Sequence, residues 1–186
     1  TSEVLDVKVI QWQNKYLITE FKGELLIIDQ NRAHQLVLFH KLKKQSRGNA
    51  LSQKLLFPVE IQSNPTEISQ LKSIEIDLVN FGFDVEFKED SFQVNALPTD
   101  VQVENTEGIF SDFLKELDLH GQIDFNVEIS KIIAKNTAIK KGVSLLPEQA
   151  KYLAQQLLQL KEPNFSPYGK PVFVQVSENE IFKKLN

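Results

Sequence analysis

Apolar and polar positions alternate in short runs over the first third of the chain. The runs Val7–Gln11, Tyr16–Phe21 and Glu24–Ile28 have the length and apolar content of strands, and Lys22-Gly23 supplies a tight turn. Over residues 31–44 the apolar positions recur at helical spacing instead. The pattern predicts an antiparallel sheet that leads directly into a helix.

A second helix is predicted over residues 65–81. Asn64 stands at the N-cap, Pro65 at the first helical position and Gly82 just past the end. The apolar residues expected on its buried face are Ile68, Leu71, Ile74, Leu78 and Phe81. These signals predict one helix with one buried face.

Further strands and helices complete the pattern. Leu55–Ile61 is interrupted by Pro58, which suits an edge strand because proline cannot donate to a ladder. Phe83–Phe87 and Phe92–Ala96 predict a hairpin, and Val172–Val176 predicts a last strand. The remaining helical patterns cover residues 108–117, 125–139, 147–160 and a short segment opened by a Ser177–Glu180 capping box. This order predicts an α+β fold with a mixed, mostly antiparallel sheet and helices.

Composition narrows the function classes. The chain has 186 residues, 41% hydrophobic and 25% charged, as in a globular protein of one domain or two small ones. It has no cysteine, which excludes disulfides, thiolate zinc sites and cysteine nucleophiles. No apolar run approaches the roughly 20 residues that span a bilayer, and the N-terminus lacks signal-peptide features, so we expect a cytoplasmic protein without membrane contact. The absence of methionine leads us to expect a fragment of a longer protein.

Charge is unevenly distributed along the chain. The net charge of −4 disfavours a protein whose main task is to bind nucleic acid, since backbone phosphates require Lys and Arg. Between Glu24 and Glu60, Asp29 is the only acid, and the bases are Arg32, Lys41, Lys43, Lys44, Arg47 and Lys54. A solvated helix end accounts for the three lysines at 41–44, because cations are favoured near C-terminal carbonyls. The alternative is a weak, non-specific DNA contact by these lysines and Arg47.

The segment Leu25–His40 raises the question of a metal site, because it holds Asp29, His34 and His40. A hydrolytic zinc or manganese site needs three or four converging ligands and an open position for water. On a helix His34 and His40 point about 120° apart and cannot share an ion. We expect His40 to be structural and Asp29 to cap the helix or lie in its first turn. The sequence has no Gly-rich phosphate loop and no nucleophile elbow.

Two stretches carry the most informative motifs. "LLIIDQ" followed by "NRAHQLVLF" looks like an Asp-Gln-His-Ala signature at the start of a helix. The end of the chain, from "NTAIKKG" to "EIFKKL", looks like a helix, a Cys-Pro-His-Gly-Arg-Pro loop, a strand and a terminal helix. Together they resemble the C-terminal domain of the MutL family of DNA mismatch-repair proteins. The resemblance implies a domain that dimerises two chains, with residues 1–54 and 130–186 as the dimerisation subdomain and 55–129 as an external one.

The family's endonuclease motif is matched only in part. Asp29 and Gln30 match it. The motif's His and Ala fall on Asn31 and Arg32, and its two Glu fall on Gln35 and His40. The family's Ala-Cys-Arg segment falls on Ala134, Lys135 and Asn136. The Cys and His of its loop fall on Ser166 and Tyr168. Because the soft ligands and both helix carboxylates are replaced, we expect no metal, no catalytic residue and no cofactor in this domain.

A third stretch is "SQKLLFPVE", residues 52–60. It resembles the Gln-x-Leu-x-x-Pro segment of MutL C-terminal domains and the peptides that dock on the bacterial replication sliding clamp, through Gln53, Leu55, Leu56, Phe57 and Pro58. Such a peptide presents a glutamine to a polar subsite and apolar side chains to a hydrophobic pocket. The alternative is an ordinary strand that buries Leu55 and Phe57 and points Leu56 the other way.

Two classes of function remain. The first is a homodimerisation and docking domain of a mismatch-repair MutL protein that lacks the endonuclease motif and binds the sliding clamp. The resemblance further implies an N-terminal ATPase outside this chain, MutS-family partners through the full-length protein, and association with the nucleoid during repair. The second class is an enzyme, either a nuclease with substituted ligands or an unrelated α+β hydrolase. The lack of cysteine and of any acid from Gln30 to Val59 favours the first class.

Overall fold

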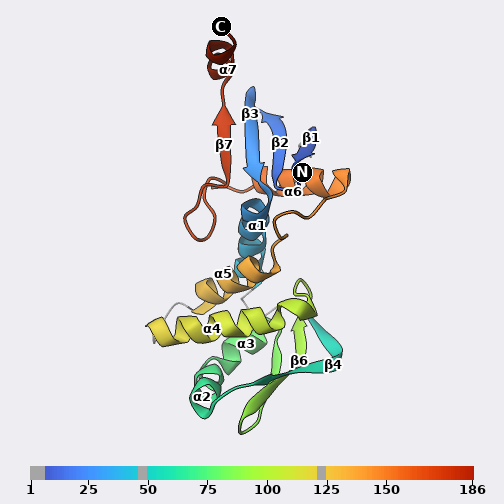
Figure 1. The fold of residues 1–186 in the computed structure, drawn as a ribbon. Coiled ribbons are helices and arrows are strands. Elements are labelled where there is room, and N and C mark those ends of the chain that lie inside the picture. Colours follow the sequence, from blue (N-terminus) through green and yellow to red (C-terminus); the bar gives the residue numbers. More distant parts are fainter. Residues whose placement is uncertain (1–6, 46–49, 121–124) are drawn as a thin grey trace. The chain divides into compact units, whose positions relative to one another are not determined.

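The computed structural model describes residues 7–45, 50–120 and 125–186. The chain divides into two compact units, Thr1–Leu38 with Ala138–Asn186, and Phe39–Thr137 (Figure 1). The predicted α+β class is confirmed, and every strand pair in the described ranges is antiparallel.

One antiparallel sheet forms the centre of the first unit. Its strand order is β1 (Val9–Trp12), β2 (Tyr16–Phe21), β3 (Glu24–Asp29) and β7 (Phe173–Val176). Lys22 and Gly23 have φ of 54° and 80°, the backbone that a two-residue hairpin turn requires. All four strands agree with the predicted ones to within two residues.

Helices follow the sheet and cover one of its faces. Leu17, Leu26 and Ile28 are fully buried on that inner face, and α6 (Pro147–Leu158) packs against β1. The buried residues of α6 are Ala150, Leu153, Ala154 and Leu157, the stripe that its spacing predicts. The chain ends with α7 (Glu178–Leu185), which starts at the predicted capping box.

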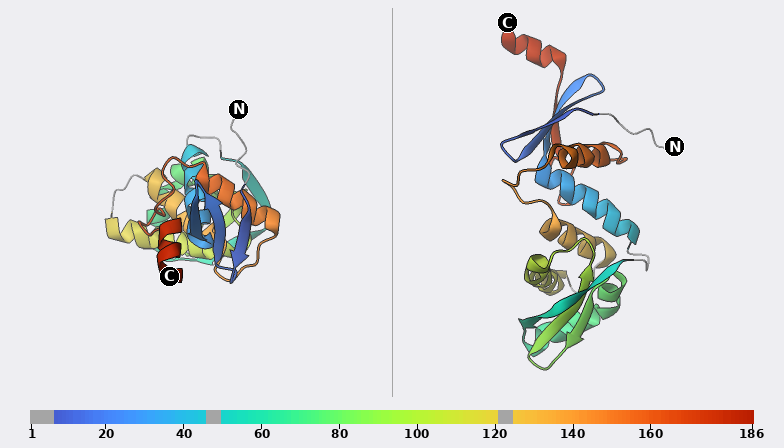
Figure 2. Two further views of the ribbon diagram at one scale, coloured as in Figure 1. Left: turned by 90° about the horizontal axis from the view of Figure 1, so that it is seen from above. Right: turned by 90° about the vertical axis from the view of Figure 1, so that its right-hand side faces the viewer.

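The second unit is built on a three-stranded sheet of order β4 (Ser52–Gln62), β6 (Ser91–Pro98) and β5 (Asp84–Phe87) (Figures 1 and 2). β4 is an edge strand, as Pro58 predicts. The helices of this unit are α2 (Pro65–Ser73), α3 (Glu75–Asn80), α4 (Thr106–His120) and α5 (Phe125–Thr137), with a 3-10 turn at Val103–Asn105. Its core includes an aromatic cluster of Phe83, Phe92, Phe110 and Phe113.

The single helix predicted over 65–81 is wrong, because the chain leaves helical geometry at Ile74 (φ −113°, ψ 13°). The five apolar residues of the predicted face span 13 positions, or about 1,300° at 100° per residue, which is 140° short of four turns. On one straight helix these five positions would be spread over about 140° of its circumference. The break between α2 and α3 allows all five side chains to be buried.

Helix α1 (Gln30–Gln45) agrees with the helix predicted over 31–44 and runs from the first unit into the second. The expected subdomain boundaries at 54/55 and 129/130 lie within the second unit, where β4 pairs with β6 and α5 packs on α4. None of the helices in residues 7–45, 50–120 and 125–186 has both the length and the apolar content that a membrane span requires.

Candidate functional site

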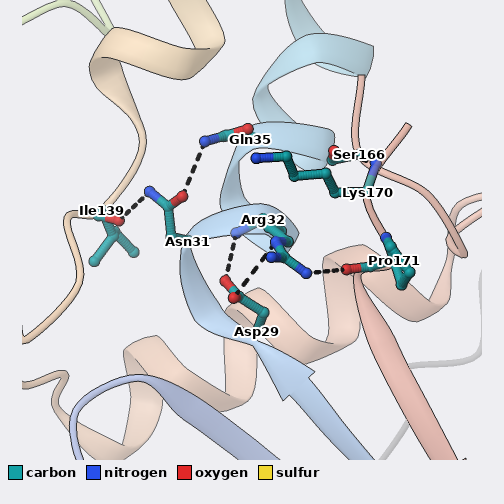
Figure 3. Close-up of polar contacts among 8 residues, drawn as sticks. All are labelled: Asp29, Asn31, Arg32, Gln35, Ile139, Ser166, Lys170 and Pro171. Atoms are coloured by element: carbon teal, nitrogen blue, oxygen red, sulfur yellow. Dashed lines mark hydrogen bonds and ion pairs between the residues drawn. The ribbon is translucent and has the colours of Figure 1, made fainter. Parts of the chain in front are cut away.

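The substituted endonuclease motif lies where β3 ends and α1 begins (Figure 3). Asp29 Oδ1 accepts the backbone N–H of Arg32 at 2.9 Å, so Asp29 caps α1 as predicted. The Arg32 guanidinium lies 3.6 Å from Asp29 Oδ2 and donates from Nη1 to the Pro171 carbonyl at 2.8 Å. The one carboxylate retained from the motif is thus paired with a fixed side-chain cation.

The next turn of α1 is tied to the segment after α5. Asn31 Nδ2 donates to the Ile139 carbonyl at 2.8 Å, and Gln35 Nε2 donates to Asn31 Oδ1 at 2.9 Å. His34 Nδ1 accepts the Ile139 N–H at 2.9 Å. His34 also lines a hollow of about 510 Å³ between α1 and α6, together with Tyr152. Neutral amides here bond to each other and to backbone, in positions where the resemblance expected metal ligands.

Gln30 belongs to a buried amide network that sequence analysis missed. It is 1% exposed, and its Nε2 donates to the Val143 carbonyl at 3.0 Å. Gln11 Nε2 donates to Gln30 Oε1 and to the same carbonyl, and Gln11 Oε1 accepts the Leu145 N–H. The available signal was a polar residue at an inward position of β1. This network joins β1, α1 and the segment before α6.

The other motif positions do not converge into a metal site. Ser166 is buried, and its Oγ accepts the Lys170 N–H at 3.2 Å within a tight turn. Tyr168 is partly exposed in that turn. His40 lies in the second unit, half-buried, with its ring 5.7 Å from that of Phe39. Over the ranges that the structure covers, no group of three His, Asp or Glu residues could hold a metal ion.

The positions of the Ala-Cys-Arg segment have a structural role in the second unit. Lys135 Nζ and Asn136 Nδ2 donate to Asp112 Oδ2 at 2.9 and 3.0 Å, which ties α5 to α4. Partial burial raises the pKa of Asp112, but the hydrogen bonds from Asn136, Lys135 and Lys115 outweigh it and lower the pKa below its ordinary value. Ala134 is buried.

The clamp-like stretch forms a bulge in β4. Lys54 pairs with Ala96 and Val59 with Val94, so residues 55–58 lie opposite Asn95 alone. Leu56 and Phe57 are 94% and 85% exposed. The alternative of an ordinary strand that buries both Leu55 and Phe57 is therefore wrong for Phe57, because the bulge interrupts the alternation of faces. Gln53 Nε2 donates to the Val101 carbonyl at 2.9 Å, so this glutamine has a partner in its own unit.

The outer face of the first sheet carries an apolar row that only strand register reveals. Ile10 pairs with Ile18, Ile18 with Ile27, and Ile27 with Val174, across all four strands. Ile10 and Val174 are exposed at the two sheet edges. The rows beside it add Trp12 and Tyr16, in register with Asp29, and Leu25 and Val176, in register with Glu20. Such a largely apolar face is typical of a protein interface.

The basic stretch is partly neutralised. Lys41 Nζ lies 2.7 Å from Asp100 Oδ1, and Lys43 Nζ lies 5.9 Å from the centre of the Phe39 ring. Lys44 and Lys54 are exposed. Arg47 lies outside the described residues. A DNA contact by these residues stays a prediction.

Comparison with known proteins identifies the family. Residues 9–145 match the family model described as the MutL C terminal dimerisation domain. This chain belongs to that family. It is similar to the DNA mismatch repair protein MutL of Christiangramia forsetii, with 31% identity over 98% of this chain and 30% of the relative. The MutL proteins of Clostridium botulinum strain Loch Maree and Flavobacterium johnsoniae are 32% and 29% identical over 97% and 95% of this chain, and 28% of each relative.

The chain spans less than a third of the length of these MutL relatives. The family is described as a dimerisation domain, which supports self-association of this chain. Its described surface offers apolar features for protein contacts, among them the outer sheet face and the β4 bulge.

Proposed function

We propose that this MutL domain forms a homodimer through the outer face of the β1-β2-β3-β7 sheet. The observation that carries the proposal is the apolar row from Ile10 to Val174, in register across the whole sheet. A two-fold dimer buries the same patch on both subunits, so a broad self-complementary face suits it. The mismatch-repair function of a full-length protein, with an N-terminal ATPase and MutS-family partners, would depend on this dimer contact to hold its two chains together.

Sedimentation over a concentration series tests the dimer surface. Ile10→Glu with Val174→Glu places charges at both ends of the row, and because both side chains are exposed, folding should be retained. The wild type should be a dimer at tens of micromolar and the variant a monomer. Ile76→Glu, an equally exposed apolar position on α3 in the other unit, is the control and should remain a dimer. A monomeric wild type would contradict the proposal.

The second part of the proposal is that the β4 bulge docks on the replication sliding clamp. Leu56 and Phe57 are adjacent, almost fully exposed and held by paired strand on both sides, which suits an apolar clamp pocket. Pro58 itself has no backbone N–H to donate to a neighbouring strand. To contact the clamp directly, Gln53 would have to give up its hydrogen bond to the Val101 carbonyl. Its other possible role is to hold the bulge in place through that hydrogen bond. So small a contact should bind weakly, on the order of 10 to 100 μM.

Clamp binding by variants tests this part. Leu56→Ala with Phe57→Ala should abolish binding, since these side chains provide the apolar contact. Gln53→Ala separates the two roles of the glutamine, because loss of binding with an unchanged unfolding midpoint indicates a direct clamp contact. Ile76→Ala is the matched control. Equal binding by the wild type and the Leu56–Phe57 variant, with both dimeric, would leave β4 as an edge strand only.

A further inference from the structure

The last helix of the first unit has an apolar side that no described residue buries. None of the side chains of α7 is buried. Ile181, Phe182 and Leu185 are spaced to share one side of the helix, and they are 39%, 64% and 79% exposed. In Figure 1 and in the right-hand view of Figure 2, α7 stands beyond the end of β7, away from α6.

Local signals start this helix but cannot hold it alone. Ser177 N–H donates to Glu180 Oε2 at 2.8 Å, and Glu180 N–H donates to Ser177 Oγ at 3.3 Å, which completes a capping box. Lys183 and Lys184 lie in the last turn, where cations are favoured. An isolated helix shorter than about 12–15 residues is nevertheless marginal in water, because nucleation costs more than a few turns return. The apolar side of α7 therefore requires a packing partner.

We infer that this partner is a second copy of the chain, against which α7 packs as an arm. Only Ser177 separates α7 from Val176, whose side chain lies on the outer face of the sheet, so the arm continues that face. A standard interface uses roughly 20–30 residues a side, and the outward residues of four short strands are too few. The arm supplies the missing surface. This inference rests on the proposed dimerisation through the sheet.

The first test measures dimer affinity in the 186-residue chain. Phe182→Ser with Leu185→Ser should raise the dimer dissociation constant about 100-fold. The far-UV circular dichroism spectrum should show no loss of structure beyond that of α7 itself. Ile76→Ser with Val79→Ser, two exposed apolar residues of α3, is the matched control and should dimerise as the wild type does. Wild-type affinity in the α7 variant would overturn the arm. If Ile10→Glu with Val174→Glu still dissociates the dimer, the proposed sheet interface survives that failure.

The second test locates the arm directly. A photo-reactive benzoylphenylalanine at Phe182 should give a covalent dimer on a denaturing gel, with cross-linked peptides from the sheet or α7 of the other copy. The same group at Ile76 should give monomer. Mixing isotope-labelled and unlabelled copies distinguishes cross-links within one chain from cross-links between two chains. Cross-links found only within one chain would overturn the inference. A dimer that forms without any product at Phe182 would do the same.

Discussion

Arg32 Nη1 donates a 2.8 Å hydrogen bond to the carbonyl of Pro171, a residue 139 positions later in the chain. The same guanidinium pairs with Asp29, the helix cap. The start of α1 is thereby fastened to the turn before β7 by a cation that belongs to the protein.

Replacing that cation should loosen the first unit. Arg32→Ala removes a charged hydrogen bond and the Asp29 pair, and because the side chain is a third exposed, the expected loss of unfolding free energy is about 1 kcal/mol. Arg32→Lys keeps the charge but not the forked geometry of the guanidinium, so its unfolding free energy should lie between those of the wild type and Arg32→Ala. Urea unfolding measures both. An unchanged unfolding midpoint for Arg32→Ala would show that the contacts of Arg32 with Asp29 and Pro171 do not stabilise the fold.

Gln30→Ala should be more damaging than its modest size change suggests. It removes hydrogen bonds to Gln11 and Val143 at a site that is 1% exposed, so we expect a loss of about 2–3 kcal/mol. Gln35→Ala, at a half-buried position of the same helix, is the control and should cost less than 1 kcal/mol. Thermal and urea unfolding should rank them in this order. The reverse order would contradict the buried network.

Asp112 should make stability depend on pH in the acid range. Its pKa in the folded protein is below the ordinary value of 3.8, so its contribution is present above that value and is lost as pH falls through the lower folded pKa. Asp112→Asn should therefore be less stable than the wild type at pH 6, and the gap should narrow below pH ~4. A gap that stays constant from pH 6 to pH 3 would contradict the role of the charge.

Gly108→Ala tests how closely α4 and α5 approach. A Cβ at Gly108 would lie 2.8 Å from Asn136 Oδ1, and that side chain is held by Asp112. The usual gain of about 1 kcal/mol for alanine in a helix should thus be absent or reversed. In an Asn136→Ala background the gain should return. Equal effects of Gly108→Ala in both backgrounds would exclude the clash.

We expect no metal-dependent nicking of supercoiled plasmid by this domain. Asp29 is paired with Arg32, and the surrounding motif positions carry amides. Manganese or zinc should give no nicks above a chelator control. Nicks that chelator removes and that Asp29→Ala abolishes would favour the alternative of a nuclease with substituted ligands.

The sequence by itself determined the elements whose causes lie within a few residues. Neighbouring side chains and backbone preferences account for the Lys22-Gly23 turn, the Asn64 and Ser177 caps, the buried stripe of α6 and the edge position of β4. The break at Ile74 was not predicted, because the cap and glycine signals at the two ends and the shared face of the apolar residues all indicated one helix.

Only the tertiary structure decided which distant groups meet. Asn31 and Ile139, like Arg32 and Pro171, are more than 100 residues apart, so no local pattern predicts their hydrogen bonds. The apolar row depends on the register between β3 and β7, which come from opposite ends of the chain. An ordinary strand would bury Phe57 together with Leu55, which was the alternative to clamp docking. The unequal pairing of β4 with β6 instead exposes Phe57, because the register of a strand against its neighbour sets which of its residues face the core.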